Sequence, residues 1–353
     1  MRIVRLATVP FFLLHHLRSQ IEASVAAGHE VMLIASPIDG ADALERIAGV
    51  HFAPIDIPRG IAPSRDLAAL VSMYRLFRSF RPDVVHSTTP KAGLLSALAA
   101  FLARVRVRLH TFTGQPWLEL SGPIRWFSMA SDWLIVHLNT HCYADSPSQR
   151  DFLIAEGLCR AWNISVLESG SLAGVDLSRF DSASLAARAL KCRETLAIPL
   201  TARVVLFVGR VTRDKGMLEL ADAFSRIKTV DSEVYLVVVG PTEPQRDPLP
   251  PALLQALESD DRIRMTGYDP APEKYLAMAD LLCLPSYREG FGNVVIEAGA
   301  LGVPTVGTRI DGLRDAVVDG VAKSIDARSY RRYAESTGLD DNVPKAFAIA
   351  RQA

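Results

Sequence analysis

The sequence has few of the residues that stabilise small secreted domains or hold metal ions. Four cysteines occur among 353 residues, with no CxxC pair and no histidine at metal-ligand spacing. This pattern argues against a zinc site and a disulfide framework, and it favours reduced thiols in a cytoplasmic protein. The cysteines are Cys142, Cys159, Cys192 and Cys283.

The sequence also lacks a net charge. Its 39 lysines and arginines balance 39 aspartates and glutamates. A protein that binds duplex nucleic acid through its overall field has a large basic excess, so we expect no nucleic-acid partner. Any binding that is driven by charge must therefore be local.

Long apolar runs are missing as well. The stretch LLSALAAFLA, which begins at Leu94, has only about half the length that a membrane-spanning helix needs. The apolar run near the N-terminus is interrupted by Pro10 and is not followed by a clear cleavage site. We therefore expect a first strand there rather than a signal peptide.

Short apolar runs alternate with longer helical patterns along the chain, which is typical of parallel βαβ units. We expect an α/β protein with two Rossmann-like domains, residues 1–170 and residues 171–353. The pattern restarts after residue 200, and the stretch ESGSLAGVDLSRF between the two series has the composition of a hinge. Ligands bind at the carboxyl ends of such strands, so we expect the two domains to face each other across a central cleft. The predicted strands are RIVRLAT, EVMLIAS, HFAPIDI, DVVHST, VRLHTF and HCYADS, then RVVLFVGR, EVYLVVVG, RIRMTG, LLCLPS and PTVGT.

The stretch YREGFGNVVIEAGALGVPTVGT, which begins at Tyr287, places two glutamates around a glycine-rich turn. We predict that Asn293 caps a helix running through VVIEAGA. Glu289 then lies in the loop before this helix, and Glu297 lies about one turn inside it.

The chemistry of this stretch suits a ligand that carries phosphate and hydroxyl groups. Backbone amides at a helix start, unobstructed at Gly290 and Gly292, form a site for a phosphate or a sugar oxygen. Ionised carboxylates accept strong hydrogen bonds from hydroxyl groups. The alternative is that Glu289 is solvated and that Glu297 only interacts favourably with the helix dipole.

The same residues, REGFGNVVIEAGALGVPTVGT, resemble the donor-binding signature of retaining glycosyltransferases of family 4, which have two facing Rossmann-like domains. The resemblance implies that Glu289 binds hydroxyls of the donor sugar and that Glu297 holds the ribose hydroxyls. It also implies that backbone amides approach the sugar and the diphosphate, namely those of Gly290, Phe291, Gly292 and Asn293.

A second stretch, FVGRVTRDKGMLEL, matches the same family independently. The resemblance assigns Arg210 and Lys215 to the donor diphosphate, and a fork and a point charge there suit a pyrophosphate leaving group. By itself, a basic pair after a strand is usually a solvated loop. In RMTGYDP, Tyr268 resembles a residue that contacts the nucleotide base, although a strand-ending turn explains this stretch equally well. We predict Glu289, Arg210 and Lys215 as the catalytic group.

In the first half, VHSTTPKAGLLSALAA and HTFTGQPW are similar to family members that extend bacterial surface glycans on a polyprenyl-diphosphate carrier. The acceptor-side residues are then Thr89, Lys91, Thr113 and Gly114. Many relatives carry a histidine where this chain has Thr113, and a threonine cannot act as a base at neutral pH. We expect His110 to be a packed strand residue, and deprotonation of the acceptor to be assisted by the leaving phosphate. The sequence has no DxD signature at a strand end, so we predict neither a catalytic metal nor a cofactor.

The segment from residue 65 to residue 108 carries eight basic and two acidic side chains, a net charge of +6. Apolar residues are interspersed between the arginines. This combination fits a surface that docks onto anionic lipid, and it fits a solvated basic face over an ordinary core stripe equally well.

The last residues depart from the family pattern. After AVVDG, relatives continue with a TGLLV-like strand and with helices that cross back to the first domain, whereas this chain continues VAKSIDARSY and stops early. We therefore expect no strand in this region, and an atypical tail after about residue 320.

The sequence as a whole predicts a retaining, metal-independent glycosyltransferase. Its donor is a UDP-hexose or a UDP-N-acetylhexosamine, and its acceptor is a lipid-linked saccharide at the inner face of the cytoplasmic membrane. Two alternatives remain: an inactive protein that binds a nucleotide sugar, and a nucleotide-sugar epimerase or phosphorylase of similar fold. The first binds UDP without transfer, and the second turns over without a saccharide acceptor.

Overall fold

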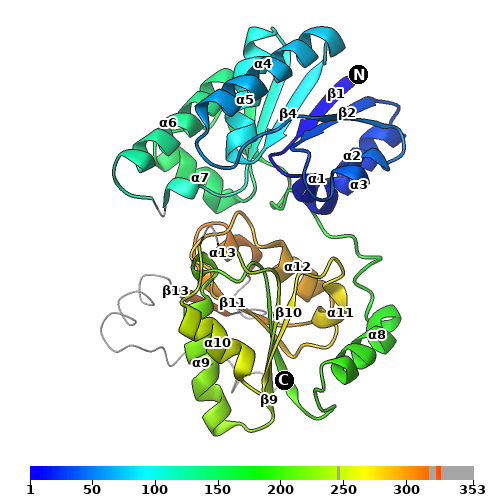
Figure 1. The fold of residues 1–353 in the computed structure, drawn as a ribbon, viewed down its shortest axis with the longest axis vertical. Helices are drawn as coiled ribbons and strands as arrows, with labels where there is room; N and C mark the ends of the chain where they lie inside the picture. Colours follow the sequence, from blue (N-terminus) through cyan, green and yellow to red (C-terminus); the bar gives the residue numbers. More distant parts are fainter. Residues whose placement is uncertain (119, 245–246, 318–322, 327–353) are drawn as a thin grey trace. The chain divides into compact units, whose positions relative to one another are not determined.

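The computed structural model divides the chain into two α/β units, Met1–Gly174 and Val175–Ala353. It describes residues 1–118, 120–244, 247–317 and 323–326. Each unit contains one parallel sheet with helices packed on it (Figure 1). The predicted fold class, with two Rossmann-like domains, is confirmed, whereas the cleft between the domains stays a prediction.

The first unit has a seven-stranded sheet in the order β3-β2-β1-β4-β5-β6-β7. The chain moves outward from β1 to β3, returns to β4 beside β1, and then continues in the other direction, so the switch point lies between β1 and β4. The elements are β1 (Arg2–Leu6), α1 (Pro10–His16), α2 (Arg18–Ala26), β2 (Glu30–Ala35), α3 (Ala41–Glu45), β3 (Val50–Pro54), α4 (Pro63–Phe80), β4 (Val84–Thr88), α5 (Pro90–Leu102), β5 (Val107–Phe112), η1 (Pro116–Leu118), α6 (Gly122–Leu138), β6 (His141–Ala144), α7 (Pro147–Ala155) and β7 (Ile164–Val166).

The second unit has a six-stranded sheet in the order β10-β9-β8-β11-β12-β13, with its switch point between β8 and β11. The elements are α8 (Ser182–Thr195), β8 (Arg203–Val208), η2 (Arg213–Lys215), α9 (Met217–Val230), β9 (Val234–Val239), α10 (Pro251–Ser259), β10 (Ile263–Gly267), α11 (Glu273–Leu276), β11 (Leu281–Leu284), α12 (Asn293–Ala300), β12 (Thr305–Arg309), α13 (Leu313–Ala316) and β13 (Lys323–Asp326).

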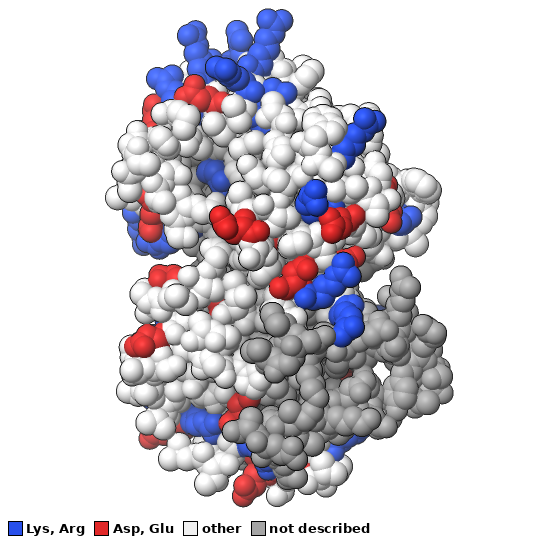
Figure 2. All heavy atoms as spheres, turned by 180° about the vertical axis from the view of Figure 1, so that it is seen from behind, with Lys and Arg blue, Asp and Glu red and all other residues white. Residues whose placement is uncertain are grey.

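The arginine-rich segment corresponds to α4, β4, α5 and the start of β5. Met73 and Phe77 of α4 are buried in the core, so part of this segment serves folding. Basic side chains project from the end of the first unit at which the N-terminus lies (Figure 2). Five exposed arginines belong to the C-terminal end of α4 and to the turn before β5, at the amino edge of the sheet: Arg75, Arg78, Arg81, Arg104 and Arg106.

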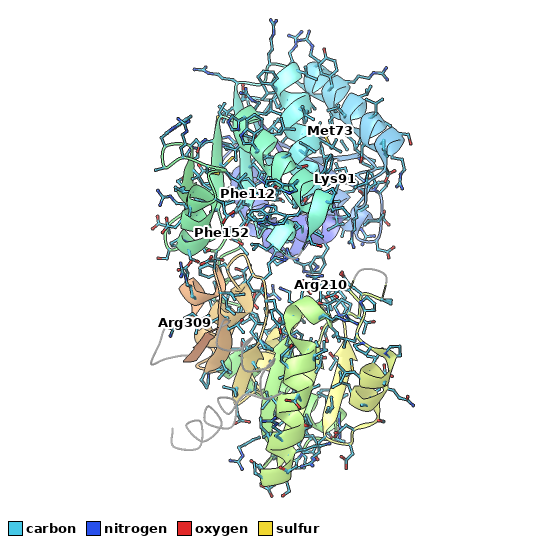
Figure 3. All side chains as sticks on the ribbon, turned by 90° about the vertical axis from the view of Figure 1, so that its left-hand side faces the viewer. Met73, Lys91, Phe112, Phe152, Arg210 and Arg309 are labelled. Atoms are coloured by element: carbon cyan, nitrogen blue, oxygen red, sulfur yellow. The ribbon has the colours of Figure 1, made fainter. Side chains whose placement is uncertain are left out.

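The alternation of side chains along the strands buries apolar residues on both faces of the first sheet. Val31 and Leu33 of β2 pack with α1 and α2, whereas Ile34 packs with α4 and α5. Met73 and Phe112 lie inside this unit (Figure 3). Burial on both faces is the reason that these strands read as nearly continuous apolar runs.

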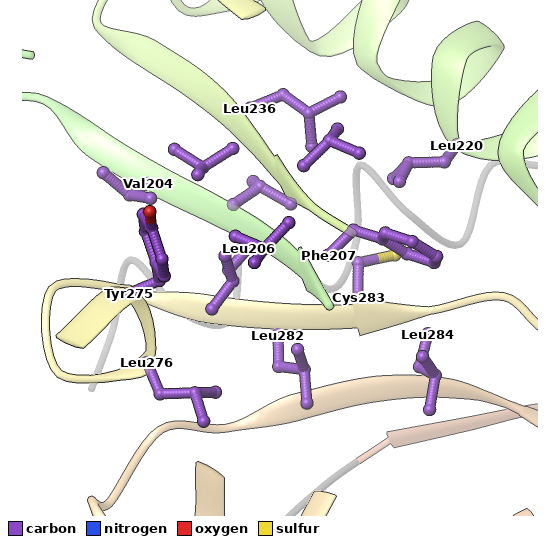
Figure 4. Packing of buried hydrophobic residues seen from close by; sticks show 14 of the residues in the cluster. Val204, Leu206, Phe207, Leu220, Leu236, Tyr275, Leu276, Leu282, Cys283 and Leu284 are labelled. Carbon is purple, nitrogen blue, oxygen red and sulfur yellow. The ribbon is translucent and has the colours of Figure 1, made fainter. Parts of the chain in front are cut away.

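The second unit is organised around one large hydrophobic cluster. Side chains of β8, β9 and β11 pack there with residues of α9 and α11 (Figure 4). Phe207 and Phe224 are among the largest fully buried side chains of this cluster. This core fixes the positions of the strand ends, from which the candidate site is built.

Three details differ from the predictions. Strand β7 was not predicted, because its three residues are too short to give a periodic pattern. The expectation of no strand near the end is wrong, because Lys323–Asp326 pairs in parallel with β12 as β13. Backbone groups pair whatever their side chains, so an edge strand needs no apolar run. Asn293 is not a helix cap, because Gly292 takes that position with a φ of 87° and Asn293 is the first helical residue. The predicted tail beyond residue 326 lies outside the described residues.

Candidate active site

A chain of alternating charges lies at the carboxyl ends of β8 and β11, which are neighbours at the switch point of the second sheet. Arg210, just after β8 (Figure 3), donates to the Asp214 carboxylate over 2.9 Å and to the Glu243 carboxylate over 2.9 Å. Arg288, in the loop after β11, lies 3.3 Å from the same Asp214 oxygen. Asp214 therefore joins two guanidinium groups that come from different loops.

Lys215 and Glu289 form the next link of this chain. The Lys215 Nζ donates to Glu289 Oε1 over 2.6 Å and to the Arg288 carbonyl over 3.1 Å. The side chains of Lys215 and Glu289 are only 13% and 15% exposed, so the pair is largely withdrawn from water. The structure thus brings the three residues predicted as the catalytic group into one cluster.

Glycines allow the loops of this cluster to approach one another. Gly216 has a φ of 73°, and a Cβ atom there would overlap the Pro285 carbonyl at the end of β11. Gly240, at the end of β9, faces the Gly209 carbonyl so closely that a Cβ atom would overlap it as well. Both positions therefore require glycine, and both hold the segment around Arg210 and Lys215 against neighbouring strand ends.

The charges of the cluster stabilise one another. Burial opposes ionisation of Asp214, but the Thr212 hydroxyl and the cations Arg210, Lys215 and Arg288 hold its pKa below the ordinary value. Burial also opposes the charge of Arg210, but Asp214 and Glu243 raise its pKa. The site therefore holds charged groups of both signs at neutral pH, with cations able to meet a diphosphate and carboxylates able to accept from hydroxyls.

The start of α12 supplies backbone amides next to the charge cluster. Gly290 and Phe291 follow Glu289 directly, and the Phe291 ring is buried. Gly292 has a φ of 87°, and a Cβ atom there would lie 2.7 Å from the end of the Leu313 side chain, so another residue would be strained and would require that side chain to shift. The approach of a ligand to these backbone amides stays a prediction.

Glu297 lies one turn into α12 and is partly buried. Burial raises the pKa of its carboxyl to about 7; Arg179 opposes this rise, and Glu273 adds to it. Glu273 is itself buried and is held by Arg179 over 3.0 Å and by Arg188 over 3.4 Å. A carboxyl that is costly to ionise and faces few cations is suited to neutral hydroxyl partners.

The remaining predicted donor residue is more peripheral. Tyr268 follows β10, two strands away from β8 in the sheet order, and is 49% exposed. Burial and Asp269 raise the pKa of its hydroxyl.

Sequence reasoning missed Asp214, Glu243 and Arg288. Asp214 and Arg288 each lie directly beside a predicted residue, so they were within the quoted motifs. Their role as counter-ions depends on the adjacency of β8 and β11, which the motifs alone do not reveal.

The predicted acceptor-side residues follow β4 and β5 of the first sheet. Thr89 has a φ of 70° at the start of α5, and its hydroxyl oxygen accepts from the Thr8 amide over 3.0 Å. This contact bridges the ends of β4 and β1 at the switch point. The Lys91 ammonium donates to Asp66 over 2.8 Å and to the Gly60 carbonyl over 2.9 Å.

The loop after β5 contains the other two acceptor-side residues. Thr113 is half-buried and Gly114 is buried, with a φ of 111°. His110 is buried within β5, and its Nδ1 lies 2.9 Å from the Ser87 hydroxyl. Its burial within β5 confirms that His110 is a packed strand residue. The same burial lowers the pKa of His110 to about 3.

The comparisons with known proteins agree with this architecture. The chain matches the model of the "Glycosyl transferase 4-like domain" over residues 15–170 and the model of "Glycosyl transferases group 1" over residues 190–337. It is 30% identical over 309 residues to the capsular polysaccharide biosynthesis glycosyltransferase CapM of Staphylococcus aureus, covering 86% of this chain and 78% of the relative. It is 26% identical over 276 residues to the UDP-Gal:alpha-D-GlcNAc-diphosphoundecaprenol alpha-1,3-galactosyltransferase of Escherichia coli, covering 77% and 69% of the two chains.

Solved structures share the fold. The complex of Anabaena Alr3699/HepE with UDP and glucose superposes with a TM-score of 0.71 at 21% identity, covering 100% of this chain and 95% of that one. WaaG, a glycosyltransferase involved in lipopolysaccharide biosynthesis, superposes with a TM-score of 0.70 at 15% identity, covering 99% of each chain.

Proposed function

Because the chain belongs to the glycosyltransferase family that combines a 4-like domain with a group 1 domain, we propose that it transfers a sugar from a UDP-linked donor to a lipid-linked saccharide. The donor is a UDP-hexose or a UDP-N-acetylhexosamine, and the product belongs to a bacterial surface polysaccharide. The name of the Staphylococcus relative supports the assignment to a surface polysaccharide. The name of the Escherichia relative supports the UDP donor and the lipid-linked acceptor.

The observation that carries the proposal is the Lys215–Glu289 pair at the switch point, with Arg210 beside it. In the free protein these cations are neutralised by carboxylates. A donor diphosphate offers the cations a doubly charged partner, and its arrival releases the Glu289 carboxylate to accept from the sugar hydroxyls. The same side chains therefore pair with one another in the structure and exchange these contacts for contacts to the donor.

In the proposed reaction, the bond between the anomeric carbon and the diphosphate oxygen breaks, and a bond from that carbon to the acceptor oxygen forms on the same face. The proton of the acceptor hydroxyl passes to the departing phosphate oxygen. Arg210 and Lys215 stabilise the negative charge that develops on the diphosphate. Glu289 orients the sugar and Glu297 holds the ribose. The first unit's Thr113 orients the acceptor without taking its proton.

We propose that the reaction needs no metal ion, since side-chain cations take the place of one beside the leaving group. We also propose that the protein works at the inner face of the cytoplasmic membrane, where a lipid-linked acceptor would lie. Activity that is lost on addition of a chelator and restored by a divalent cation would contradict the first of these statements.

The test is a transfer assay with radiolabelled UDP-sugars and membranes that contain lipid-linked acceptors. Lys215→Ala and Glu289→Gln are expected to lower the turnover number about 100-fold to 1,000-fold, as expected for the loss of a group that stabilises the transition state. Lys228→Ala is the matched control, because Lys228 forms an ion pair with Asp260 in the same unit but away from the site. Equal transfer by all four proteins contradicts the site. Binding of UDP without transfer supports the inactive alternative, and turnover without an acceptor supports the epimerase.

A further inference from the structure

One helix of the first unit exposes an apolar face that folding does not require. Helix α6 buries Asp132, Ile135 and Val136 against the unit and would be expected to carry polar residues on its other side. Instead, several of its exposed side chains are large and apolar, and the segment before it continues the pattern. The exposed fractions are 48% for Leu118, 36% for Leu120, 57% for Ile124, 67% for Trp126, 60% for Phe127, 47% for Trp133 and 36% for Leu134.

This face carries almost no charge of its own. The ionisable side chains of α6 are Arg125, Asp132 and His137. Asp132 is buried, and the Arg125 guanidinium lies 5.6 Å from the centre of the Trp117 ring. A continuous apolar surface of this kind on a folded domain marks a place where something else binds.

Arginines adjoin the C-terminal end of α6. The Arg108 Nε donates to the carbonyl of Leu138, the last residue of α6, over 2.7 Å. Its guanidinium also lies 5.7 Å from the centre of the Phe101 ring, which is itself half-exposed at the end of α5. Arg104 and Arg106 are exposed in the same short stretch. The apolar face therefore ends at a group of cations.

We propose that this α6 face docks onto an anionic lipid bilayer together with Arg104 and Arg106. The face consists of Leu118, Leu120, Ile124, Trp126, Phe127, Trp133 and Leu134. Indole rings and aliphatic side chains enter the boundary between headgroups and acyl chains, while arginines contact lipid phosphates. Tryptophan suits this boundary because one end of its ring is apolar and the other donates a hydrogen bond. The described arginines at the end of this face favour a bilayer over a second copy of this neutral chain, because lipid phosphates are their natural partners. Among the described helices, none is long and apolar enough to span a bilayer, so the contact is an interfacial one.

The position of α6 relates the bilayer contact to the acceptor-side loop, an inference that rests on the proposed function. The helix begins directly after the loop that holds Thr113 and Gly114, at the carboxyl edge of the sheet. The Trp117 Nε1 donates to the Asp132 carboxylate over 2.7 Å, which ties this loop to α6. A bilayer on the α6 face would therefore lie beside the acceptor-side loop, where the head of a lipid-linked saccharide would be presented.

The test is co-sedimentation of the full chain with vesicles of phosphatidylglycerol and phosphatidylcholine at equal amounts, compared with phosphatidylcholine alone. The wild type is expected to bind the anionic vesicles, and Trp126→Ser combined with Phe127→Ser is expected to weaken this binding at least tenfold. The matched control is Trp162→Ser, because Trp162 is 73% exposed between α7 and β7 and does not belong to the α6 face. Brominated lipid is expected to quench part of the fluorescence of a chain that lacks Trp133 and Trp162, in which Trp126 is exposed and Trp117 is buried.

Several outcomes overturn the proposal: equal binding by the double variant and the wild type, equal losses in the control and the double variant, or no quenching. A wild-type dimer in lipid-free solution that the double variant abolishes would assign the face to a second copy.

Circular dichroism checks that the double variant is folded, and Arg104→Glu with Arg106→Glu tests the contribution of the arginines independently. UDP binding, measured on the same variants, is expected to be unchanged. A double variant that binds vesicles as well as a wild type with intact UDP binding therefore rejects the docking surface alone, whereas absent UDP binding in the wild type rejects the donor site.

Discussion

Replacing Glu297 by glutamine is expected to stabilise the second unit at pH 8 while weakening its binding of UDP. The carboxyl has an ordinary pKa of 4.5 in the unfolded chain and a pKa of about 7 in the folded protein, chiefly because of burial. Between these values the folded protein binds one proton more than the unfolded chain. Its contribution to stability is therefore complete below pH 4.5 and is lost as the pH rises through 7.

The size of this loss follows from the same two values. The interval from 4.5 to about 7 corresponds to about 3 kcal/mol of unfolding free energy. Glu297→Gln has nearly the same volume and cannot ionise, so its unfolding free energy is expected to lack this decline. At pH 8 the variant should therefore be more stable than the wild type by up to about 3 kcal/mol, and at pH 4 the two should be alike.

The assay is urea unfolding between pH 4 and 8.5, and two probes detect the transition. Circular dichroism reports both units, whereas tryptophan fluorescence reports the first unit, which contains all four tryptophans: Trp117, Trp126, Trp133 and Trp162. The fluorescence transition is expected to be the same in the wild type and the variant, and the remaining transition is expected to shift. Parallel pH profiles for the two proteins, or a variant that is less stable at pH 8, would refute the reasoning.

The affinity for UDP is expected to change with pH in the direction opposite to the stability. The ionised Glu297 accepts hydrogen bonds from the ribose hydroxyls, so the affinity of the wild type is expected to rise as the pH increases through 7. A hydrogen bond to a charged group is worth about 1.5 to 3 kcal/mol, so Glu297→Gln should weaken binding about tenfold to 150-fold at pH 8. Titration calorimetry measures both effects, and an unchanged affinity in the variant would contradict the ribose contact.

Three further substitutions test separate parts of the structure. Burial raises the pKa of Asp132 from 3.8 to about 7, although the hydrogen bond from Trp117 opposes the rise. Asp132→Asn should therefore raise the unfolding free energy of the first unit at pH 8 by up to about 4 kcal/mol. Urea unfolding followed by fluorescence measures this change, and a loss of stability would contradict it. Gly240→Ala places a Cβ atom against the Gly209 carbonyl, so it should destabilise the second unit by more than about 2 kcal/mol and abolish UDP binding. Normal UDP affinity in calorimetry would contradict this prediction, because it would show that the loop can move to make room for the Cβ atom. Arg81 caps α4 with a φ of 51°, and its side chain is exposed. Arg81→Gly should therefore stabilise the first unit by about 1 kcal/mol in the same unfolding assay. A decrease in the unfolding free energy would show that the arginine side chain contributes more than its backbone strain costs.

The sequence predicted the strands well because most of them are buried on both faces. After Arg203, the run RVVLFV is entirely apolar, and VYLVVV contains no charged residue, so the identity of these strands does not depend on distant contacts. The short β7 and the edge strand β13 escaped prediction because neither needs a long apolar run. Gly292 was missed as the cap of α12 because a left-handed backbone gives no sequence signal beyond the glycine itself.

The candidate site was predictable as a set of residues but not as a set of contacts. The motifs contain Arg210, Lys215 and Glu289, whereas the pairing of Lys215 with Glu289 depends on β8 lying beside β11. That adjacency results from a crossover between strands far apart in the chain, which no local pattern encodes. The exposed face of α6 was hidden for a related reason. Large apolar residues are not confined to one side of its sequence, and only packing decides which side remains outside.

The central claim is that the second unit holds the diphosphate and the ribose of the donor at the switch point of its sheet. The most direct measurement is a crystal structure of the protein with UDP bound. We expect the diphosphate within hydrogen-bonding distance of Arg210 and Lys215, and the ribose hydroxyls on the Glu297 carboxylate. UDP bound elsewhere, or a diphosphate that leaves the Lys215–Glu289 and Arg210–Asp214 pairs in place and untouched, would contradict the claim.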